Sequence, residues 1–343
     1  MYDSLQSKDL LQIWDLSDKD LFWQYPVITE KQVMESLKSL KNRHCLSRQY
    51  VYLAIPWATI IDRNIYLKSG LESQLVALID KIFSMQKKMD PSVVYITCCQ
   101  HIYFKRVLSV LKLIKVSILF ASHKTTSLKE TDGIKLMPLQ LFAVNVEDPA
   151  RNRGFDTVDF NLVERPYLYS FTGYYSKNYL TPVRRHLFEM RHPINCLMEC
   201  TKKWHFVDTV YREQAKIYKD VAKPVEIDNV ERYNKLLLRS RFSLCPSGTG
   251  PNSIRLWESM AIGAIPVILS DTLDLPAIPN PNYQWSDTVV WIKEKEVKSL
   301  SKILGQIDSY RETLLRKNCL EVYKLFSGKN FALHIYNFLN IQR

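Results

Sequence analysis

Short apolar runs alternate with helical repeats along the first third of the chain. Residues 71–85 (LESQLVALIDKIFSM) and 103–113 (YFKRVLSVLKL) place apolar side chains three and four positions apart, which is typical of amphipathic helices. Runs rich in branched and aromatic residues lie around them, at residues 49–55, 93–97 and 116–120. This alternation predicts a parallel sheet whose strands are joined by crossover helices.

A second series of strands and helices follows a polar stretch at residues 147–164, which is the best candidate for a linker. We expect its strands at residues 167–172, 202–207, 242–245 and 265–269 and its helices at residues 181–190, 230–239 and 254–262. The tail has three helical segments, at residues 299–304, 310–326 and 331–339. Residues 1–45 form a polar lead-in with short amphipathic helices.

These patterns predict an α/β protein with two Rossmann-like domains that face each other across a cleft. We expect an amino-terminal domain at residues 1–155, a carboxyl-terminal domain at residues 160–320, and a helix at residues 321–343 that packs back toward the first domain. The length of 343 residues agrees with two domains at roughly 150 residues each. Ligands of open parallel sheets bind outside the carboxyl ends of the strands, so the cleft is the expected binding site.

The composition is that of a folded globular protein with a basic balance. Hydrophobic residues make up 46% and charged residues 24%, which excludes a largely disordered chain, a collagen and a disulfide-stapled miniprotein. The net charge of +12 favours an anionic partner. Phosphates of a sugar nucleotide, a nucleic acid and the surface of an anionic membrane all meet that description.

The start of the sequence, its apolar runs and its cysteines indicate the cellular compartment. The acidic start lacks the basic and apolar segments of a secretory signal, and no apolar run has the length of a membrane span. Seven cysteines, an odd number, are typical of free thiols, so we expect the cytoplasm, with peripheral contact to a membrane. A lumenal fragment of an anchored protein would give the same pattern. Cys196 and Cys200, with His192, are an alternative metal site on one face of a helix.

The most informative stretch is residues 240–271 (SRFSLCPSGTGPNSIRLWESMAIGAIPVILSD). A buried strand stops at Pro246, a loop of small residues follows, and a helix begins after Ser253. Unpaired N–H groups at a helix start attract an anion, and the glycines let the backbone approach it, so a diphosphate fits here. Arg255 adds a forked donor to phosphate oxygens, and Glu258, three residues later, is placed to accept from ribose hydroxyls.

The same stretch also fits an ordinary strand–helix–strand crossover. In that interpretation Ser253 only caps the helix, and Arg255 and Glu258 form a surface ion pair. The loop is neither a Walker A nor a GxGxxG sequence, so the pattern by itself does not decide between the two.

The order of these residues resembles the exostosin family of glycosyltransferases (glycosyltransferase family 47). That family has a strand ending in Pro, a Gly/Ser loop, a Ser-x-Arg-Leu-x-Glu helix and a Gly-x-Ile-Pro-Val-Ile strand before Asp, as residues 246–271 do. Upstream, the sequence from Arg165 to Gly173 is similar to the family's Arg-x-x-Leu-x-x-Phe-x-Gly strand. Tyr174 and Tyr175 depart from the family, which often has basic residues there.

The resemblance implies a GT-B architecture and an inverting transfer of sugar from a nucleotide donor, usually UDP-linked, with no metal and no other cofactor. Asp18-Lys19-Asp20, the single Asp-x-Asp of the chain, is then solvated surface. The resemblance also implies that the acceptor is a glycan or glycolipid in polysaccharide synthesis. The residues expected to bind the donor are Arg165, Gly173, Arg184, Ser247, Gly248, Ser253, Arg255 and Glu258.

An inverting transfer needs a base that takes the proton of the acceptor hydroxyl. Candidates that follow predicted strands of the first domain are Asp62, His101 and His123, with Glu147 or Asp148 near the linker. His101 and His123 lie where parallel strands open to the expected cleft. His123 has an alternative role, in which it contacts phosphate or acceptor without proton transfer.

Two other functions remain open on the sequence. One is a GT-B transferase that uses a GDP- or CMP-sugar. The other is a basic nucleic-acid-binding protein, which the interleaving of acidic and basic residues and the lack of an aromatic-basic RNA motif disfavour.

Overall fold

The computed structural model describes residues 10–40, 46, 48–66, 71–152, 155, 158–160, 162–203 and 227–341. Its contacts divide the chain into two compact units. Unit 1 comprises Met1–Gln24, Ile28–Leu139 and Phe326–Arg343, and unit 2 comprises Tyr25–Val27 and Gln140–Leu325. The boundary between the units therefore follows Leu139 and precedes the polar stretch at residues 147–164, where the sequence predicts a linker. The last residues of the chain belong to unit 1.

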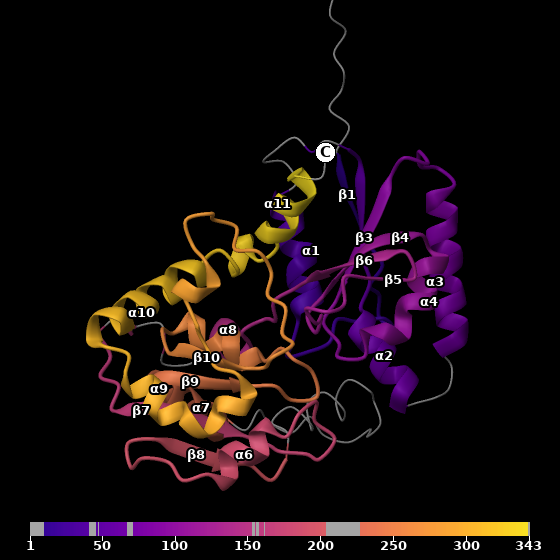
Figure 1. Ribbon diagram of the computed structural model, residues 1–343. Helices are drawn as coiled ribbons and strands as arrows, with labels where there is room; N and C mark the ends of the chain where they lie inside the picture. The colour runs from indigo at the N-terminus through magenta and orange to yellow at the C-terminus, as the bar shows by residue number, and fades with distance from the viewer. Residues whose placement is uncertain are drawn as a thin grey trace, which may run out of the picture. The chain divides into compact units, whose positions relative to one another are not determined.

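Unit 1 contains a six-stranded sheet in the order β1-β2-β3-β4-β6-β5 (Figure 1). Its strands are β1 (Leu11–Asp15), β2 (Tyr50–Ala54), β3 (Val94–Cys99), β4 (Val116–Ala121), β5 (Glu130–Thr131) and β6 (Ile134–Pro138). All neighbours pair in parallel except β5 and β6, which form a hairpin. Asp132 and Gly133 both have positive φ in the hairpin turn, as a two-residue Asp-Gly turn requires.

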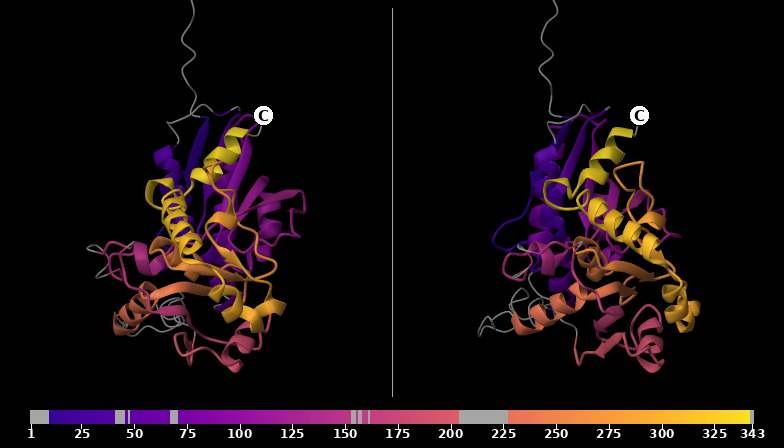
Figure 2. Two further views of the ribbon diagram at one scale, coloured as in Figure 1. Left: turned by 60° about the vertical axis from the view of Figure 1, so that its left-hand side comes forward. Right: turned by 90° about the vertical axis from the view of Figure 1, so that its left-hand side faces the viewer.

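Helices cover both faces of the sheet in unit 1. They are α1 (Thr29–Leu40), α2 (Trp57–Tyr66), α3 (Leu71–Gln86), a 3-10 turn η1 (Phe104–Val107) that continues into α4 (Leu108–Leu113), a 3-10 turn η5 (Gly328–Asn330), and α11 (Leu333–Ile341). Helices α3 and α4 lie on one face, and α11 lies beside α1 on the other (Figures 1 and 2). The fully buried Trp57 is part of the core, and its indole N–H donates to Thr97.

The structure corrects the description of residues 1–45 as a lead-in. Leu11–Asp15 is a strand that pairs in parallel with Tyr50–Ala54 along its whole length, and α1 is a helix of 12 residues. The strand lies at the edge of the sheet, so only Leu11 and Trp14 are buried. An acidic, half-exposed edge strand lacks the continuous apolar run that made the inner strands recognisable.

Unit 2 contains a five-stranded sheet in the order β11-β10-β9-β7-β8, with every pair parallel. Its strands are β7 (Tyr167–Gly173), β8 (Leu197–Cys200), β9 (Ser240–Pro246), β10 (Ile265–Leu269) and β11 (Val290–Trp291). The chain leaves β7 toward β8 on one side and returns to β9 on the other. The order of strands therefore reverses between β7 and β9, and ligands bind at such a switch point in open α/β sheets.

The helices of unit 2 are mostly short. They are α5 (Val144–Glu147), α6 (Val183–Glu189), α7 (Ile227–Leu238), α8 (Ile254–Ala261), α9 (Leu300–Gly305) and α10 (Ser309–Tyr323), with 3-10 turns η3 (Trp285–Asp287) and η4 (Glu294–Ser299). Helix α8 packs against α10, and α6 packs against η4. The buried Tyr169, Phe171 and Phe242 occupy the centre of its core.

The α/β class with two parallel sheets is confirmed, and most of the predicted elements are present. The prediction of a strand at residues 202–207 is wrong for Lys202 and Lys203, which lie in a bend. Residues 204–207 lie outside the described residues. The strand is Leu197–Cys200 instead, and it is half-exposed at the edge of the sheet. Among the described residues, no helix combines the length and the apolar character that crossing a bilayer requires.

Candidate active site

The switch point of unit 2 gathers most of the residues that the sequence singled out. Strand β7 ends at Gly173, β9 ends at Pro246, and the loop after β9 runs into helix α8. Because parallel strands end at one edge, Gly173, Ser247, Gly248, Ser253 and Arg255 lie at the same edge of the sheet. The sequence prediction of a shared site is consistent with this arrangement.

Arg184, on helix α6, holds the loop after β9 in place. Its guanidinium donates to three carbonyl oxygens: Nε to Ser247 (2.9 Å), Nη1 to Tyr174 (3.0 Å) and Nη2 to Pro246 (3.3 Å). The side chain also lies over the ring of Tyr179, with 4.9 Å between Cζ and the ring centroid. Burial lowers the pKa of Arg184 to about 10, which still leaves it charged at neutral pH.

Close packing around Arg184 explains a glycine in this loop. A Cβ atom at Gly248 would lie 2.9 Å from Nη2 of Arg184, a distance that real Cβ contacts do not show. Gly248 also donates its N–H to the carbonyl of Gly250, and its carbonyl accepts from Leu180. The loop is therefore built around the arginine, and a side chain at Gly248 would displace it.

Arg255 lies in the first turn of α8 between two aromatic rings. Its Cζ is 4.8 Å from the ring centroid of Phe171 and 4.9 Å from that of Tyr233. One nitrogen, Nη2, donates to the carbonyl of Thr172, whereas Nη1 is buried without a hydrogen-bond partner among the described residues. A buried guanidinium nitrogen without a partner costs free energy unless a ligand supplies an acceptor.

Two hydroxyl groups at this edge have different surroundings. Ser253 precedes α8 in an extended conformation, and its side chain makes no capping hydrogen bond. The hydroxyl of Ser247 is 2.9 Å from that of Thr181 and donates to Glu294 Oε1 (3.2 Å). Ser253 therefore occupies the N-cap position without the side-chain hydrogen bond that the alternative interpretation assigns to it.

Ser270 is a polar residue of this edge that the sequence analysis missed. It follows strand β10, and its hydroxyl is buried with no partner among the described residues. Its position directly after a strand of the switch-point sheet is the signal that could have found it.

Glu258 is buried rather than exposed. It is 2% exposed, Oε1 accepts the N–H of Asn145 (3.0 Å), and Oε2 accepts the hydroxyl of Tyr233 (2.6 Å). Burial raises the pKa of its carboxyl, which the two hydrogen bonds and Arg255 oppose. A surface ion pair with Arg255 is excluded, and the ribose contact expected for Glu258 stays a prediction.

Arg165 lies apart from the other donor candidates. It precedes β7, at the amino end of the sheet, and its guanidinium donates to backbone carbonyl groups, among them Leu238 (2.7 Å) and Ile262 (2.6 Å). Burial lowers its pKa to about 9. The structure therefore gives Arg165 the role of a tie between segments at the opposite end of the strands.

Gly173 has no room for a side chain, because a Cβ atom there would lie 2.8 Å from the ring of Phe171. This local packing is a reason for glycine at the end of β7 that does not involve a ligand.

In unit 1, two of the proposed bases form a pair at the carboxyl edge of the sheet. Nε2 of His101 is 2.9 Å from Oδ1 of Asp62, and both side chains are nearly buried. Nδ1 of His101 accepts the backbone N–H of Tyr103 (3.0 Å). A neutral His101 therefore carries its proton on Nε2 and donates it to Asp62.

A chain of two side-chain amides, which the sequence analysis missed, leads to the same carboxylate. Nε2 of Gln100 donates to Oε1 of Gln24 (2.8 Å), and Nε2 of Gln24 donates to Oδ2 of Asp62. Gln100 is fixed in turn by Glu30, whose carboxyl Oε1 accepts the N–H groups of Gln100 and Ala58. Burial raises the pKa of Glu30 to about 8. These contacts join residues up to 76 positions apart, so no local pattern reveals them.

The other base candidates differ from the pair. Burial lowers the pKa of His123 to about 3, with a smaller effect of nearby His101, and its Nδ1 has no partner among the described residues. Glu147 and Asp148 belong to unit 2 and accept the hydroxyls of Tyr323 and Tyr25, respectively.

The alternative metal site is not formed. His192 uses both ring nitrogens, one with the hydroxyl of Tyr169 (2.9 Å) and one with the carbonyl of Leu187 (2.7 Å). Cys196 directly precedes strand β8 and Cys200 is its last residue, so the two cysteines do not share a helix face, and at four positions apart along a strand they are separated by roughly 13 Å. Within the described ranges, no group of three His, Cys, Asp or Glu side chains is arranged to hold a metal ion.

A family model matches this chain over more than half of its length. The model of the exostosin GT47 domain covers residues 117–307, which include β7, the loop after β9 and helix α8. The chain belongs to the exostosin GT47 family. The family resemblance seen in residues 165–173 and 246–271 is thereby confirmed, and the family is one of glycosyltransferases.

Curated relatives match a short part of the chain. A probable glucuronosyltransferase of Oryza sativa subsp. japonica is 39% identical over 92 residues, which are 27% of this chain and 21% of that protein. A probable beta-1,4-xylosyltransferase of Arabidopsis thaliana is 38% identical over 99 residues, which are 28% of this chain and 22% of that protein. The matches thus span about a fifth of those relatives.

Solved structures are similar only at a distance. A pneumococcal O-GlcNAc transferase, GtfA, solved with UDP and GlcNAc, is 10% identical with a TM-score of 0.36, over 90% of this chain and 60% of that one. The amino-terminal domain of a Candida albicans trehalose-6-phosphate phosphatase is 9% identical with a TM-score of 0.40, over 89% of this chain and 73% of that one. The fold assignment therefore depends on the two sheets themselves.

Proposed function

We propose that this chain is an inverting GT-B glycosyltransferase that moves a sugar from a UDP donor to a hydroxyl of a glycan or glycolipid in polysaccharide synthesis. The observation that carries the proposal is the arginine-lined edge at the switch point of unit 2. The names of the curated relatives suggest glucuronic acid or xylose as the sugar.

The leaving diphosphate needs positive charge and hydrogen-bond donors that are already in place. Arg255 offers the buried Nη1 without a partner, and Arg184 keeps the adjoining loop in a fixed conformation. The side chain of Ser253 makes no capping hydrogen bond at the start of α8, so it does not compete with phosphate oxygens for the first N–H groups of the helix. Together these groups can neutralise the charge that develops on the leaving group.

We further propose that Asp62 is the base and that His101 is a positioning residue. Both ring nitrogens of His101 are occupied, Nδ1 by Tyr103 and Nε2 by Asp62, so the ring has no lone pair for an acceptor proton. His123 is a weak base, since its pKa is about 3. The carboxylate of Asp62 is oriented by both His101 and Gln24, and each of its oxygens keeps a second lone pair.

Calorimetric titration with UDP tests the donor site. Arg255→Ala and the milder Arg255→Lys should each weaken UDP binding, and the alanine variant should do so by roughly 10- to 100-fold, the loss expected for hydrogen bonds to a charged group. Arg185→Ala is the matched control, because Arg185 lies on α6 beside Arg184 but is exposed and pairs with Glu189 (3.8 Å). An equal loss in Arg185→Ala, or tighter binding of GDP or CMP, would contradict the proposal.

The rate of UDP-sugar hydrolysis tests the base. Asp62→Asn keeps the shape of the side chain and should lower the rate by about 100-fold or more, with unchanged UDP affinity. His101→Gln should cost less and alter the pH dependence of the rate, because an amide still donates to Asp62. His123→Gln should leave the rate close to that of the wild type. If His123→Gln abolished hydrolysis and Asp62→Asn did not, the base would be His123.

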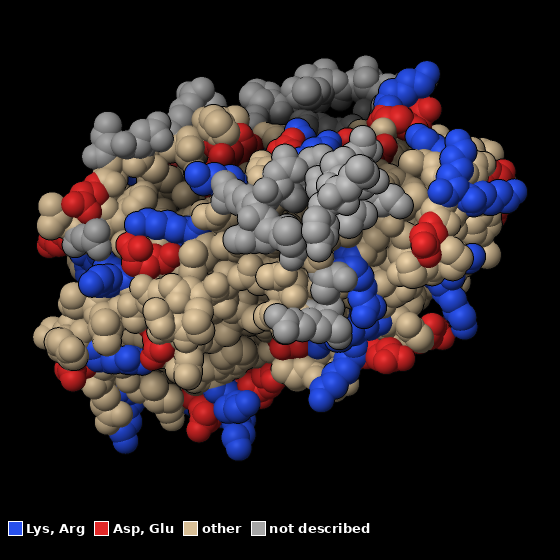
Figure 3. All heavy atoms as spheres, turned by 90° about the horizontal axis from the view of Figure 1, so that it is seen from above, with Lys and Arg blue, Asp and Glu red and all other residues tan. Residues whose placement is uncertain are grey.

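Nucleic-acid binding is the weaker candidate. On the face shown in Figure 3, Lys and Arg side chains lie among Asp and Glu side chains instead of forming one continuous basic field. A duplex held by its phosphates needs such a field. Binding to a random duplex with a steep salt dependence would favour this second candidate.

A further inference from the structure

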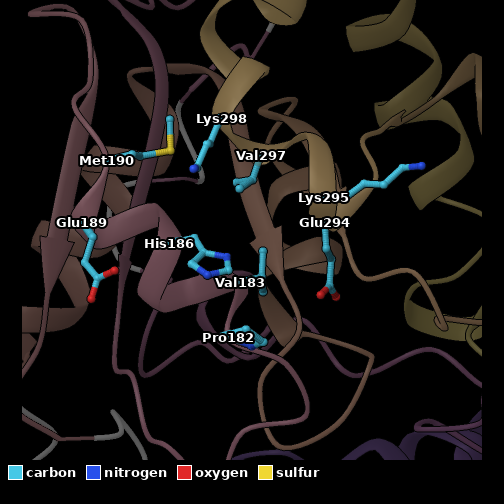
Figure 4. A pocket seen from close by; sticks show the side chains of 9 residues that line it. All are labelled: Pro182, Val183, His186, Glu189, Met190, Glu294, Lys295, Val297 and Lys298. Atoms are coloured by element: carbon cyan, nitrogen blue, oxygen red, sulfur yellow. The ribbon is translucent and has the colours of Figure 1, made fainter.

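A pocket of about 510 Å³ lies within unit 2, between helix α6 and the 3-10 turn η4 (Figure 4). Its lining comes from the stretch between Pro182 and Met190 on one side and from the stretch between Glu294 and Lys298 on the other. Arg255, Ser253 and Ser270 are not among its lining residues. The volume is within the range of about 300–1,000 Å³ that is usual for small-molecule sites.

The pocket has an apolar floor. Pro182 is exposed and Met190 is half-buried, and both line the pocket together with Val183 and Val297, which are 1% and 2% exposed and belong to the core of unit 2. Pro182 and Met190 offer a surface to C–H groups and no hydrogen bonds. The floor therefore suits a ligand with one apolar face.

The polar rim is balanced in charge. Lys298 carries a positive charge and Glu294 a negative one, whereas Glu189 pairs with Arg185 (3.8 Å). The side chains of His186 and Lys298 point into the space between α6 and η4, whereas that of Lys295 points away from it (Figure 4). A rim with donors and acceptors but no net charge gives little preference to an ion and pairs well with hydroxyl groups.

We propose that this pocket binds one uncharged sugar unit of a glycan, at a site separate from the donor edge. A pyranose ring has an apolar C–H face for Pro182 and Met190, and hydroxyls for His186, Lys298 and Glu294. Oε1 of Glu294 already accepts the hydroxyl of Ser247, so the bound sugar is one side chain away from the loop after β9. The choice of a saccharide rests on the proposed function, whereas the site itself does not require donor binding.

Nuclear magnetic resonance titration with neutral xylotriose, in the presence of saturating UDP, tests this site. Lys298→Ala should weaken binding by about fivefold, the loss of one hydrogen bond, and His186→Trp should abolish binding by filling the space. Lys295→Ala is the matched control and should bind xylotriose as the wild type does, because its side chain points away. Trigalacturonic acid, the charged comparison, should bind more weakly than xylotriose.

Three results would overturn the proposal. They are no binding of xylotriose, unchanged binding in His186→Trp, and tighter binding of trigalacturonic acid. Failure of this proposal can be distinguished from failure of the donor-site proposal. Xylotriose binding that responds to Lys298→Ala in a protein that does not bind UDP would leave the pocket assigned and remove the donor proposal.

Discussion

Single carboxylates of this protein differ mainly in what surrounds them. Asp62 accepts hydrogen bonds from the side chains of Gln24 and His101. Glu30 and Glu258 are buried, and burial raises the pKa of each. The residue type is thus a poor guide to charge, because desolvation and nearby donors decide the protonation state.

Glu30 should make the folded state less stable as the pH rises. Its pKa is about 8 when folded and near 4.5 when unfolded, so the folded chain keeps a proton that the unfolded chain loses. The stabilisation is complete below pH 4.5 and is lost as the pH rises through 8. Melting temperatures at pH 5 and pH 8 should differ less in Glu30→Gln than in the wild type. Each unit of pKa difference between the folded and unfolded states corresponds to about 1.4 kcal/mol in the free energy of unfolding.

Glu35→Gln is the control for this prediction. Glu35 lies on the same helix as Glu30, is exposed, and pairs with Lys31 (3.6 Å). Its substitution should leave the pH dependence of the melting temperature as it is in the wild type. The same pH dependence in Glu30→Gln and the wild type would contradict the assignment of a protonated Glu30.

At the scale of elements, local features set some boundaries and distant contacts set others. Helix α8 ends at a glycine because Gly263 has a φ of +70°, a left-handed conformation that side chains disfavour. By contrast, Arg165 ties the start of β7 to carbonyl groups of Leu238, Ser240 and Ile262, which follow it by more than 70 residues. The first feature is local in sequence and the second is not.

Gly263→Ala should destabilise unit 2 by about 1–2 kcal/mol, because alanine is strained at this φ. The new Cβ would also lie 3.2 Å from Cγ of Arg316. Gly305→Ala is the control, since Gly305 ends α9 and nothing lies within 4 Å of a Cβ there. It should be neutral or slightly stabilising. Chemical unfolding of both variants measures the difference, and equal effects would contradict the strain argument.

At the scale of the whole molecule, each unit has its own parallel sheet, its own core and its own set of reactive groups. Unit 1 carries Asp62 and His101, and unit 2 carries Arg184 and Arg255. The last helix of the chain, α11, belongs to unit 1, where Tyr50 donates its hydroxyl to the carbonyl of Leu339. Damage to α11 should therefore affect one unit and spare the binding groups of the other.

Leu339→Asp tests this separation. Leu339 is 0% exposed, so a buried carboxylate should destabilise unit 1 by roughly 3–5 kcal/mol. UDP affinity should stay unchanged, because the proposed donor groups lie in unit 2. Ile341→Asp is the control on the same helix, since Ile341 is 73% exposed. A loss of UDP binding in Leu339→Asp at a temperature where the protein stays folded would contradict independent units.

The sequence by itself determined the inner strands, the longer helices and the family. A fully buried parallel strand such as Ile265–Leu269 is a continuous apolar run, and that signal is local. The edge strands Leu11–Asp15 and Leu197–Cys200 escaped prediction because they are only half-buried. Their strand character comes from pairing with β2 and β7, which no local pattern records.

Only the tertiary structure decided what the polar residues do. Arg165 and Arg255 both stand in motifs of the family, yet Arg165 ties carbonyl groups at the amino end of the strands and Arg255 leaves a buried nitrogen without a partner at the carboxyl end. Gln24, Glu30 and Gln100 carry no motif, and their contacts reach Asp62 across the unit. Hydrogen bonds and burial depend on which distant segments meet, and that is fixed by the folded chain.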